Sequence, residues 1–225
     1  TPWITKPVPF NIGQGAAAAS SGGGADFESD YTNASLWTPV GSEVDVNSTV
    51  ADHVANNNAD ASTNSEVYQS LGFTLDNELW YADFQWTSTA IAASSPPSTF
   101  PIIFSSTTGV IRDTSNDALG IMTQGTYMMW YTRDATTPVD GGHISISLDT
   151  LYYLRFERTS ATGIKLSVFS DSARTTNISG SPKTATISSS IQDLDIIHHG
   201  VCGTISNNTS SWNGTNVRVY NGVSP

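Results

Sequence analysis

The sequence is poor in charged residues, and above all in basic ones. Only 13% of its 225 residues are Asp, Glu, Lys or Arg, which is well below the usual share. Nine basic residues stand against twenty acidic ones, for a formal net charge of -11. A protein with so few cations repels phosphate backbones and anionic lipid surfaces. We therefore expect neither nucleic acid nor an anionic membrane among its partners.

Cysteine and long apolar runs are equally scarce. Cys202 is the only cysteine, which excludes an intrachain disulfide and a metal site built from several cysteines. We interpret it as a buried thiol, since only His198 and His199 supply basic side chains nearby. No run approaches the roughly twenty apolar residues of a membrane helix. The opening TPWITKPVPF lacks the basic start and apolar middle of a secretion signal, which predicts a processed or trimmed N-terminus.

Alternation of apolar and polar residues is what the sequence has in plenty, as half-buried strands require. In LWYADFQW, residues 79–86, one predicted face is apolar and consists of Trp80, Ala82, Phe84 and Trp86. In LYYLRFERT, residues 151–159, the apolar face consists of Tyr152, Leu154 and Phe156. GIKLSVFSD follows after three residues, with Ile164, Leu166 and Val168 on one face. The last two runs therefore predict a hairpin.

Seven further runs predict strands, separated by loops rich in Gly, Pro, Asn, Asp and Ser. They are FPIIFSS (100–106), ALGIMTQ (118–124), TYMMWYT (126–132), GHISISL (142–148), KTATISSSI (183–191), IIHHGVCGTI (196–205) and NVRVYNG (216–222). The polar segment from Ala51 to Glu66 is interpreted as a long exposed loop. Many strands without a long amphipathic helix predict an all-β, antiparallel jelly-roll β-sandwich.

The order of five phrases resembles a known family. These phrases are DFESDYTNASLW, ELWYADFQW, LYYLRFERT, SVFSDSARTT and NVRVYNG, spread over roughly residues 25–222. This order is similar to that of the concanavalin A-like lectin/glucanase superfamily, in its laminin-G-like jelly-roll form. The resemblance implies a sandwich of two curved antiparallel sheets. It rests on strand-forming phrases and not on a catalytic signature.

Catalytic patterns are missing from the sequence, so we expect no enzyme. Hydrolases of the resembled fold carry Glu, Asp and Glu alternating on one strand face, and none of the five glutamates stands in that spacing. No Gly-X-Ser-X-Gly elbow precedes a helix, although counting residues does not exclude a Ser-His-Asp arrangement. His198 and His199 are adjacent in a predicted strand, so they point to opposite faces. We expect one packed and one solvated imidazole there.

Sugar binding in such folds uses aromatic faces with a few amides and carboxylates around them. Two predicted strands, 79–86 and 151–159, carry such side chains on the face opposite their apolar face. In a third, TYMMWYTRD, both faces are too apolar to face solvent alone. The candidate residues are Tyr81, Asp83, Gln85, Tyr127, Trp130, Tyr153 and Arg155. The alternative is that both faces of these strands are covered, one by the opposite sheet and one by a loop or a neighbour.

Calcium is the candidate ion, because loops rich in Asp, Asn and carbonyl groups supply the oxygen ligands it prefers, and several members of the resembled superfamily hold it beside their binding face. The weak candidates retained are Asp45 with Asn47, and Asp193 with Asp195; no cofactor is required. Sequons for N-glycosylation, typical of an exterior protein, begin at Asn33, Asn47, Asn177, Asn207, Asn208 and Asn213.

Residues 1–24 are unlike the remainder, residues 25–225, which form the predicted sandwich. Prolines at positions 2, 7 and 9 favour an extended chain, and the Gly/Ala/Ser run that follows could span on the order of 40 Å. The apolar side chains of this arm are Trp3, Ile4, Val8 and Phe10. Fixing such a chain costs roughly 1 to 2 kcal/mol per residue, so an ordered arm needs contacts. Strand addition to a sheet edge of a neighbour is the favoured source, and packing on its own sandwich is the alternative.

Two functions remain open. The first is a non-catalytic structural subunit of an extracellular, cell-surface or virion-surface assembly, joined through its N-terminal arm to copies of itself or to other surface subunits. The second is a lectin-like module that binds polysaccharide on its concave sheet. Assembly that depends on residues 1–24 would favour the first, and glycan binding that depends on Tyr81 and Trp130 the second.

Overall fold

Strand β6 (Trp80–Ala92) shows why this chain folds as strands. Trp80, Ala82, Phe84 and Trp86 are each 1% exposed, while the residues between them point to the opposite face. An alternation of this kind buries one face and satisfies the backbone through neighbouring strands. The sequence-based prediction of a strand with one apolar face is confirmed at this position.

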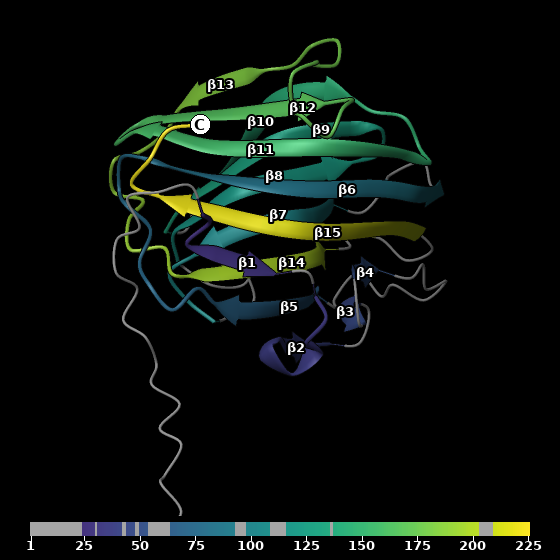
Figure 1. Cartoon of the computed structure of the whole chain (residues 1–225), viewed down its shortest axis with the longest axis horizontal. Coiled ribbons are helices and arrows are strands. Elements are labelled where there is room, and N and C mark those ends of the chain that lie inside the picture. The colour runs from purple at the N-terminus through teal and green to yellow at the C-terminus, as the bar shows by residue number, and fades with distance from the viewer. Residues whose placement is uncertain are drawn as a thin grey trace, which may run out of the picture.

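The computed structural model describes residues 24–29, 31–41, 44–47, 50–53, 64–92, 98–108, 116–135, 137–202 and 209–225. These residues form two antiparallel sheets and one short 3-10 helix, η1 (Ala34–Leu36). Figure 1 looks onto one sheet, with β6, β11 and β15 in front of β7, β8 and β9. Within the described residues, none of the helices has the length and apolar character needed to span a bilayer.

The eight-stranded sheet has the order β13-β12-β11-β6-β15-β4-β3, and β1 also pairs with β15. Its strands are β1 (Phe27–Ser29), β3 (Val44–Asn47), β4 (Val50–His53), β6, β11 (Thr150–Ser160), β12 (Gly163–Phe169), β13 (Lys183–Thr186) and β15 (Thr209–Asn221). The predicted hairpin is confirmed, because β11 and β12 pair antiparallel from Tyr153↔Phe169 to Ser160↔Gly163.

The seven-stranded sheet has the order β10-β9-β8-β7-β14-β5-β2. Its strands are β2 (Thr38–Val40), β5 (Asn64–Ser70), β7 (Ser98–Ser105), β8 (Ala118–Gln124), β9 (Tyr127–Asp134), β10 (Thr137–Ser145) and β14 (Ile196–Cys202). The two sheets form a jelly-roll β-sandwich, as the sequence predicts. Residues 1–23 of the arm lie outside the described residues. The predicted burial of the Cys202 thiol also stays a prediction, because its side chain is not described.

The main core fills the space between the two sheets. Phe84 and Phe156 of one sheet, with Phe104 and Ile121 of the other, belong to one buried cluster. A second cluster lies on the other face of the seven-stranded sheet and includes Phe100, Ile103, Ala118, Met122, Met129 and Tyr131. The prediction that both faces of residues 126–132 are apolar is therefore confirmed.

The interpretation of Ala51 to Glu66 as an exposed loop is wrong at both of its ends. The segment 51–53 belongs to β4, and β5 begins at Asn64. Ser65 and Glu66 are only 1% and 3% exposed. The Ser65 hydroxyl accepts a hydrogen bond from the Val44 backbone amide at 3.1 Å. Polar side chains with hydrogen-bond partners of this kind can be buried. A strand that buries them therefore need not show the alternation of apolar residues by which strands are predicted.

Candidate functional site

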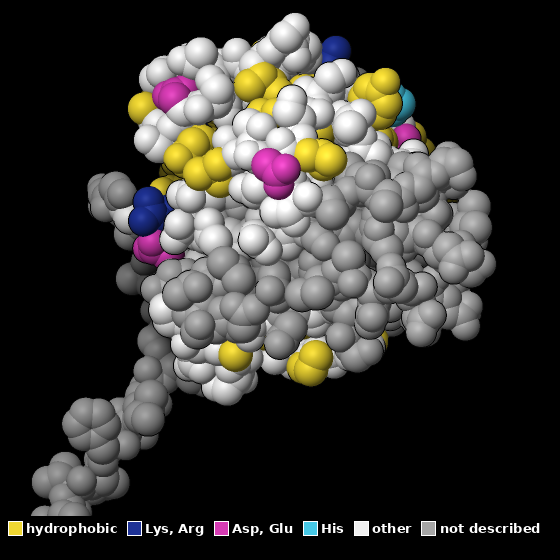
Figure 2. All heavy atoms as spheres, turned by 90° about the vertical axis from the view of Figure 1, so that its right-hand side faces the viewer, with side chains coloured by type: hydrophobic (Ala, Val, Ile, Leu, Met, Phe, Trp, Pro, Cys, Tyr) yellow, Lys and Arg dark blue, Asp and Glu magenta, His cyan; other side chains and the backbone are white. Residues whose placement is uncertain are grey.

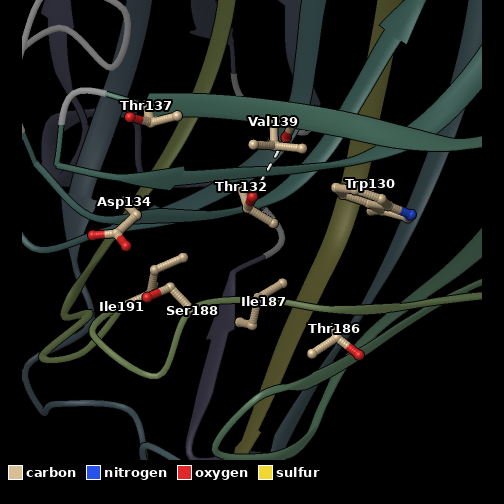
Figure 3. A pocket seen from close by; sticks show the side chains of 9 residues that line it. All are labelled: Trp130, Thr132, Asp134, Thr137, Val139, Thr186, Ile187, Ser188 and Ile191. Carbon is tan, nitrogen blue, oxygen red and sulfur yellow. Dashed lines mark hydrogen bonds between the residues drawn. The ribbon is translucent and has the colours of Figure 1, made fainter.

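A pocket of about 300 Å³ opens at one edge of the sandwich, between the two sheets. One wall comes from β9 and β10, and the other from the end of β13 and the segment that follows it (Figure 3). The lining consists of Trp130, Thr132, Asp134, Thr137, Val139, Thr186, Ile187, Ser188 and Ile191. This pocket, called the edge pocket below, is at the lower end of the size range of small-molecule sites.

Strand periodicity places three of the lining side chains on one face of β9. Trp130, Thr132 and Asp134 are two residues apart, so they point the same way. Figure 3 shows Trp130 at one end of this row and Asp134 at the other. Two glycines of the neighbouring strand β10 leave room for the indole ring. A Cβ atom would lie 2.7 Å from a Trp130 atom if placed on Gly141, and 2.6 Å if placed on Gly142. The register of β9 and β10 therefore requires small residues opposite the tryptophan.

The polar side of the edge pocket is a carboxylate with hydroxyl groups around it. The Ser190 hydroxyl donates to Oδ2 of Asp134 at 2.8 Å. Hydrogen bonds from Ser188 and Ser190 hold the pKa of Asp134 below its ordinary value, so it is a carboxylate at neutral pH. The Thr132 hydroxyl donates to the Val139 carbonyl at 3.4 Å. The pocket therefore offers both acceptors and donors beside an aromatic wall.

Two polar anchors, the buried Arg158 and the partly exposed Asp117, hold the walls of the edge pocket. Arg158, which is 1% exposed, donates from Nη1 to the Ile191 carbonyl at 2.7 Å. The carboxylate of Asp117 accepts the backbone amides of Ala135 at 3.1 Å and Gln192 at 3.2 Å. These contacts fix the end of β9 and the segment after β13 relative to the sheets. A site held in this way is organised before a ligand arrives.

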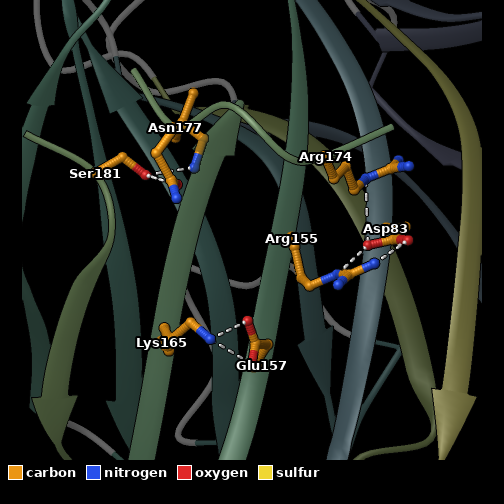
Figure 4. A network of polar contacts seen from close by, with 8 residues as sticks. Asp83, Arg155, Glu157, Lys165, Arg174, Asn177 and Ser181 are labelled. Carbon is orange, nitrogen blue, oxygen red and sulfur yellow. Dashed lines mark hydrogen bonds and ion pairs between the residues drawn. The ribbon is translucent and has the colours of Figure 1, made fainter. Parts of the chain in front are cut away.

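Five of the sequence-predicted glycan residues come together elsewhere, on the outer face of the eight-stranded sheet. The register pairs Arg155 with Asp83 and Tyr153 with Gln85 across β11 and β6. Asp83 accepts two hydrogen bonds from Arg155, at 2.7 Å and 2.9 Å. Both oxygens of this carboxylate are thus already engaged by a guanidinium group (Figure 4).

The ring of Tyr81 has neighbours on both of its faces. Tyr220 of β15 stacks on it with centroids 4.4 Å apart and planes 13° apart. The guanidinium of Arg155 lies 4.8 Å from its centroid, and β15 and β11 flank β6 on opposite edges. In this arrangement Tyr81 presents no free ring face on which a pyranose could stack.

Tyr127 and Trp130 lie apart from that group and from each other. Tyr127 is 47% exposed and faces the opposite side of β9 from Trp130, with the His143 ring 5.6 Å away. The seven candidates therefore fall in three places, and only Trp130 lines the edge pocket. Sequence reasoning missed Thr132, Asp134, Thr186 and Ser188; alternation along β9 could have found the first two.

The expectation of one packed and one solvated imidazole at positions 198 and 199 is wrong, because both are 0% exposed. They do point to opposite faces. His199 faces the core, where Nδ1–H donates to the Pro101 carbonyl and Nε2 accepts from the Tyr31 hydroxyl at 2.8 Å. Burial lowers the pKa of His199 to about 4.

His198 lies in a buried polar cluster on the other face of the seven-stranded sheet. Its Nε2 is 2.7 Å from the Ser105 hydroxyl and 3.1 Å from the Thr107 carbonyl, and its Nδ1 is 3.5 Å from Glu66. The side chains of Ser105, His198 and Glu66 contact one another in that order, as in a nucleophilic Ser-His-Glu triad. Ser105 is only 1% exposed, and its hydroxyl donates to the Thr107 carbonyl at 2.7 Å.

The candidate calcium residues lie at two separate places. Asp45 and Asn47 belong to β3, and Asp193 and Asp195 precede β14. Asn77 accepts the backbone amide of Asp193 at 3.2 Å. Across the parts of the chain that the structure describes, no group of three or more His, Cys, Asp or Glu side chains could hold a metal ion. Calcium binding stays a prediction.

Three of the sequons have described asparagine side chains, and all three are exposed: Asn33, Asn177 and Asn213. The amide oxygen of Asn177 accepts from the Ser181 hydroxyl at 2.9 Å, and that of Asn33 from Ser35 at 2.7 Å. The side chain of Asn47, and the whole of Asn207 and Asn208, lie outside the described residues. Glycosylation stays a prediction at all six positions.

No protein-family model matches the chain, and no curated protein matches its sequence. Solved structures do resemble it. The VIP36 exoplasmic/lumenal domain, in a Ca²⁺/Man3GlcNAc-bound form, is 7% identical with a TM-score of 0.60, over 89% of this chain and 90% of that one. The cellulose-induced protein Cip1 is 10% identical with a TM-score of 0.59, over 86% and 96%.

A chain from a structure of botulinum neurotoxin type C is also similar, at 9% identity and a TM-score of 0.54. The match covers 82% of this chain but only 43% of that one, so this chain spans less than half of it. At such low identity these likenesses show a shared fold, that of a lectin-like jelly roll, and nothing further.

Proposed function

We propose that the protein is a non-catalytic saccharide-binding module of the concanavalin A-like type, acting outside the cell, and that the edge pocket holds one sugar residue. The observation that carries the proposal is the combination of the Trp130 ring, the Asp134 carboxylate and several hydroxyl groups around one small pocket. A pyranose has an apolar face that packs on an aromatic ring, while its hydroxyls need paired donors and acceptors.

The structural neighbours support this choice of ligand class. The VIP36 domain is bound to Man3GlcNAc, and cell entry of botulinum neurotoxin type C depends on interaction with two ganglioside molecules. A family 7 alginate lyase of similar fold, at 10% identity and a TM-score of 0.52, is in complex with its product. Saccharides are thus a recurring partner of this architecture.

Substitution of Trp130 tests the proposal. On a glycan array followed by calorimetry, we expect Trp130→Ala to weaken the best ligand at least tenfold, since loss of an aromatic contact is worth about 0.5 to 1.5 kcal/mol beyond the buried area. Asp134→Asn, at the rim, should also weaken binding without disturbing the core. Tyr127→Ala is the matched control, because it removes an exposed aromatic from the opposite face of the same strand. Binding that survives both pocket variants would refute the proposal.

Assembly through the N-terminal arm stays a prediction, because Trp3, Ile4, Val8 and Phe10 lie outside the described residues. Strand addition needs an open edge, and the described edges are poorly suited to it. Strands β1, β2, β3 and β13 have three or four residues each. The longer edge strand β10 contains Pro138 and a register shift between Gly141 and Ile144.

Deletion of residues 1–24 decides between assembly and independent binding. If the arm joins subunits, the full chain should sediment as an oligomer and the truncated chain as a monomer, with and without a calcium chelator. If saccharide binding alone is the function, both chains should sediment alike and bind the same glycan. Equal monomeric behaviour of the two chains at high concentration would rule out the assembly role.

A further inference from the structure

Cations gather on the outer face of the eight-stranded sheet, although the chain has only nine. Arg155, Lys165 and Arg218 point outward from β11, β12 and β15, on the face opposite the buried residues of these strands. Arg174 reaches the same face from the turn after β12 (Figure 4). The chain as a whole is acidic, with a formal net charge of -11, and the described residues on the side of the molecule in Figure 2 show isolated charged side chains among uncharged ones.

These four cations face only three carboxylates. Arg155 holds Asp83 through two hydrogen bonds, Lys165 lies 2.8 Å from Glu157, and Arg218 lies 2.7 Å from Glu28. Arg174 shares Asp83 with Arg155, at 3.4 Å from Oδ1. One positive charge therefore exceeds the carboxylates paired on this face, and it is centred on Arg174.

The guanidinium of Arg174 is short of hydrogen-bond acceptors. Its side chain is only 15% exposed, and its Nε forms a long ion pair with Asp83 Oδ1, at 3.4 Å, that is not a hydrogen bond. Nη1 is 3.5 Å from the Ser172 carbonyl, at the limit of a hydrogen bond. Burial lowers the pKa of Arg174. The nearby positive charges of Arg155 and Arg218 lower it further, while the negative charge of Asp83 raises it. A mostly buried guanidinium with only these two long contacts has donors to offer to an anion.

The turn that carries Arg174 is fixed in place before any ligand binds. The Asp171 carboxylate accepts the backbone amide of Thr176 at 2.7 Å and the hydroxyl of Thr175 at 2.9 Å. Arg174 itself has a φ of 55°, which a residue with a side chain adopts at a cost of about 1 kcal/mol or more. The guanidinium carbon lies 5.9 Å from the Tyr153 ring centroid. The sheet and the turn thus hold the cation over the strand face.

We propose that Arg174, flanked by Arg155 and by the tyrosines at positions 81 and 153, binds the carboxylate of an acidic sugar residue. A carboxylate matches the planar fork of a guanidinium. The hydroxyl of Tyr81 is a further donor, since a tyrosine is protonated at neutral pH. The inference rests on the proposed function only for its choice of a saccharide as the carrier of the carboxylate. The site is separate from the edge pocket, since none of its residues lines that pocket.

Oligogalacturonate and its fully methyl-esterified counterpart form the test pair, because they differ in the carboxylate charge. We expect the protein to bind the acid more tightly than the ester, with an affinity that falls as salt rises. Arg174→Gln should weaken the acid tenfold to a hundredfold and leave the ester unchanged. Asp83 keeps both hydrogen bonds from Arg155 in this variant, so the fold should persist, which thermal unfolding would check.

Arg218→Gln is the matched control, because it removes an equally charged side chain that is 51% exposed and paired with Glu28 on the same face. It should change the affinity for the acid less than threefold. Equal loss in both variants would mean that only net charge matters and would overturn the site. A sulfated oligosaccharide that binds more tightly than the uronate, and still requires Arg174, would overturn the choice of a carboxylate.

The two proposals fail in different ways. If Arg174→Gln leaves the affinity for uronate unchanged but Trp130→Ala abolishes binding, the Arg174 site is wrong and the edge pocket remains the binding site. If uronate binding requires Arg174 while no glycan depends on Trp130, the edge pocket is wrong and the Arg174 site stands.

Discussion

Acidification from pH 7 to pH 4 should lower the free energy of unfolding by about 3 kcal/mol through His199 alone. Burial lowers the pKa of His199 to about 4, whereas a histidine in the unfolded chain titrates near 6.5. Between these two values the unfolded state binds more protons than the folded one, so stability rises with pH. The contribution is complete above about pH 6.5 and is lost as the pH falls to about 4, below which it changes no further.

The cause is the environment of the imidazole in the core. The ring packs against Trp37 and Phe84, with centroids 4.9 Å and 5.5 Å away. Nε2 accepts the Tyr31 hydroxyl proton and Nδ1 donates to Pro101. A second ring proton would have to displace the Tyr31 donor and leave a charge among aromatic rings.

Urea unfolding at several pH values measures this effect. His199→Leu should remove most of the loss between pH 6.5 and 4, although the variant starts about 2 to 4 kcal/mol less stable, because Tyr31 and Pro101 lose a partner. His143→Leu, at an exposed position, is the control and should keep the acid-dependent loss. A wild-type protein as stable at pH 4 as at pH 7 would contradict the assignment.

Replacement of Arg158 should be the second large effect, at about 2 to 4 kcal/mol of destabilisation. Its guanidinium donates to the carbonyls of Ile191 and Ala161, both at 2.7 Å. Arg158→Met keeps the apolar stem but leaves the buried Ile191 carbonyl and the part-buried Ala161 carbonyl without this donor. Because Ile191 lines the edge pocket, the same variant should also weaken saccharide binding.

Hydrogen exchange locates the damage. In Arg158→Met, amides of residues 187–192 should lose protection before those of β6 or β11, since the anchor joins that segment to the sheet. Arg158→Lys should recover part of the loss, because one ammonium replaces only some of the donors. Arg218→Met, at the exposed ion pair with Glu28, should cost under about 0.5 kcal/mol. Protection in residues 187–192 that matches wild type would show that Arg158 does not hold the pocket wall.

Strand periodicity was enough to predict which side chains share a face. The buried sets of β6, β11 and β12, and the outward direction of Asp83 and Arg155, all follow from a period of two. The same periodicity did not predict the strands whose sequence is mostly polar. Ser65 and Glu66 are buried because their polar groups have partners from distant strands, and no local pattern signals such a partner.

The sequence could not predict which faces meet. Trp130 forms a pocket with Thr186 and Ile191 because β9 and the segment after β13 come together at the open edge of the sandwich. Arg174 reaches Asp83 because a turn folds back over the neighbouring strands. Both contacts join residues more than fifty positions apart in the chain. Strand order, which sets them, has no signature in a single sequence.

The position of β15 has a consequence for how the chain reaches its native state. This strand pairs with β6 on one edge and with β4 and β1 on the other, and Phe27 is paired with Val219. Until residues 209–221 have been synthesised, β6 has one unpaired edge, and β4 and β1 lack the strand β15 with which they pair. Pairing of strands that lie far apart in the chain is slow, so this edge of β6 is paired only after β11 has covered the other edge. Unpaired strand edges are prone to aggregation, so β15 protects the edge of β6 as well as completing the sheet.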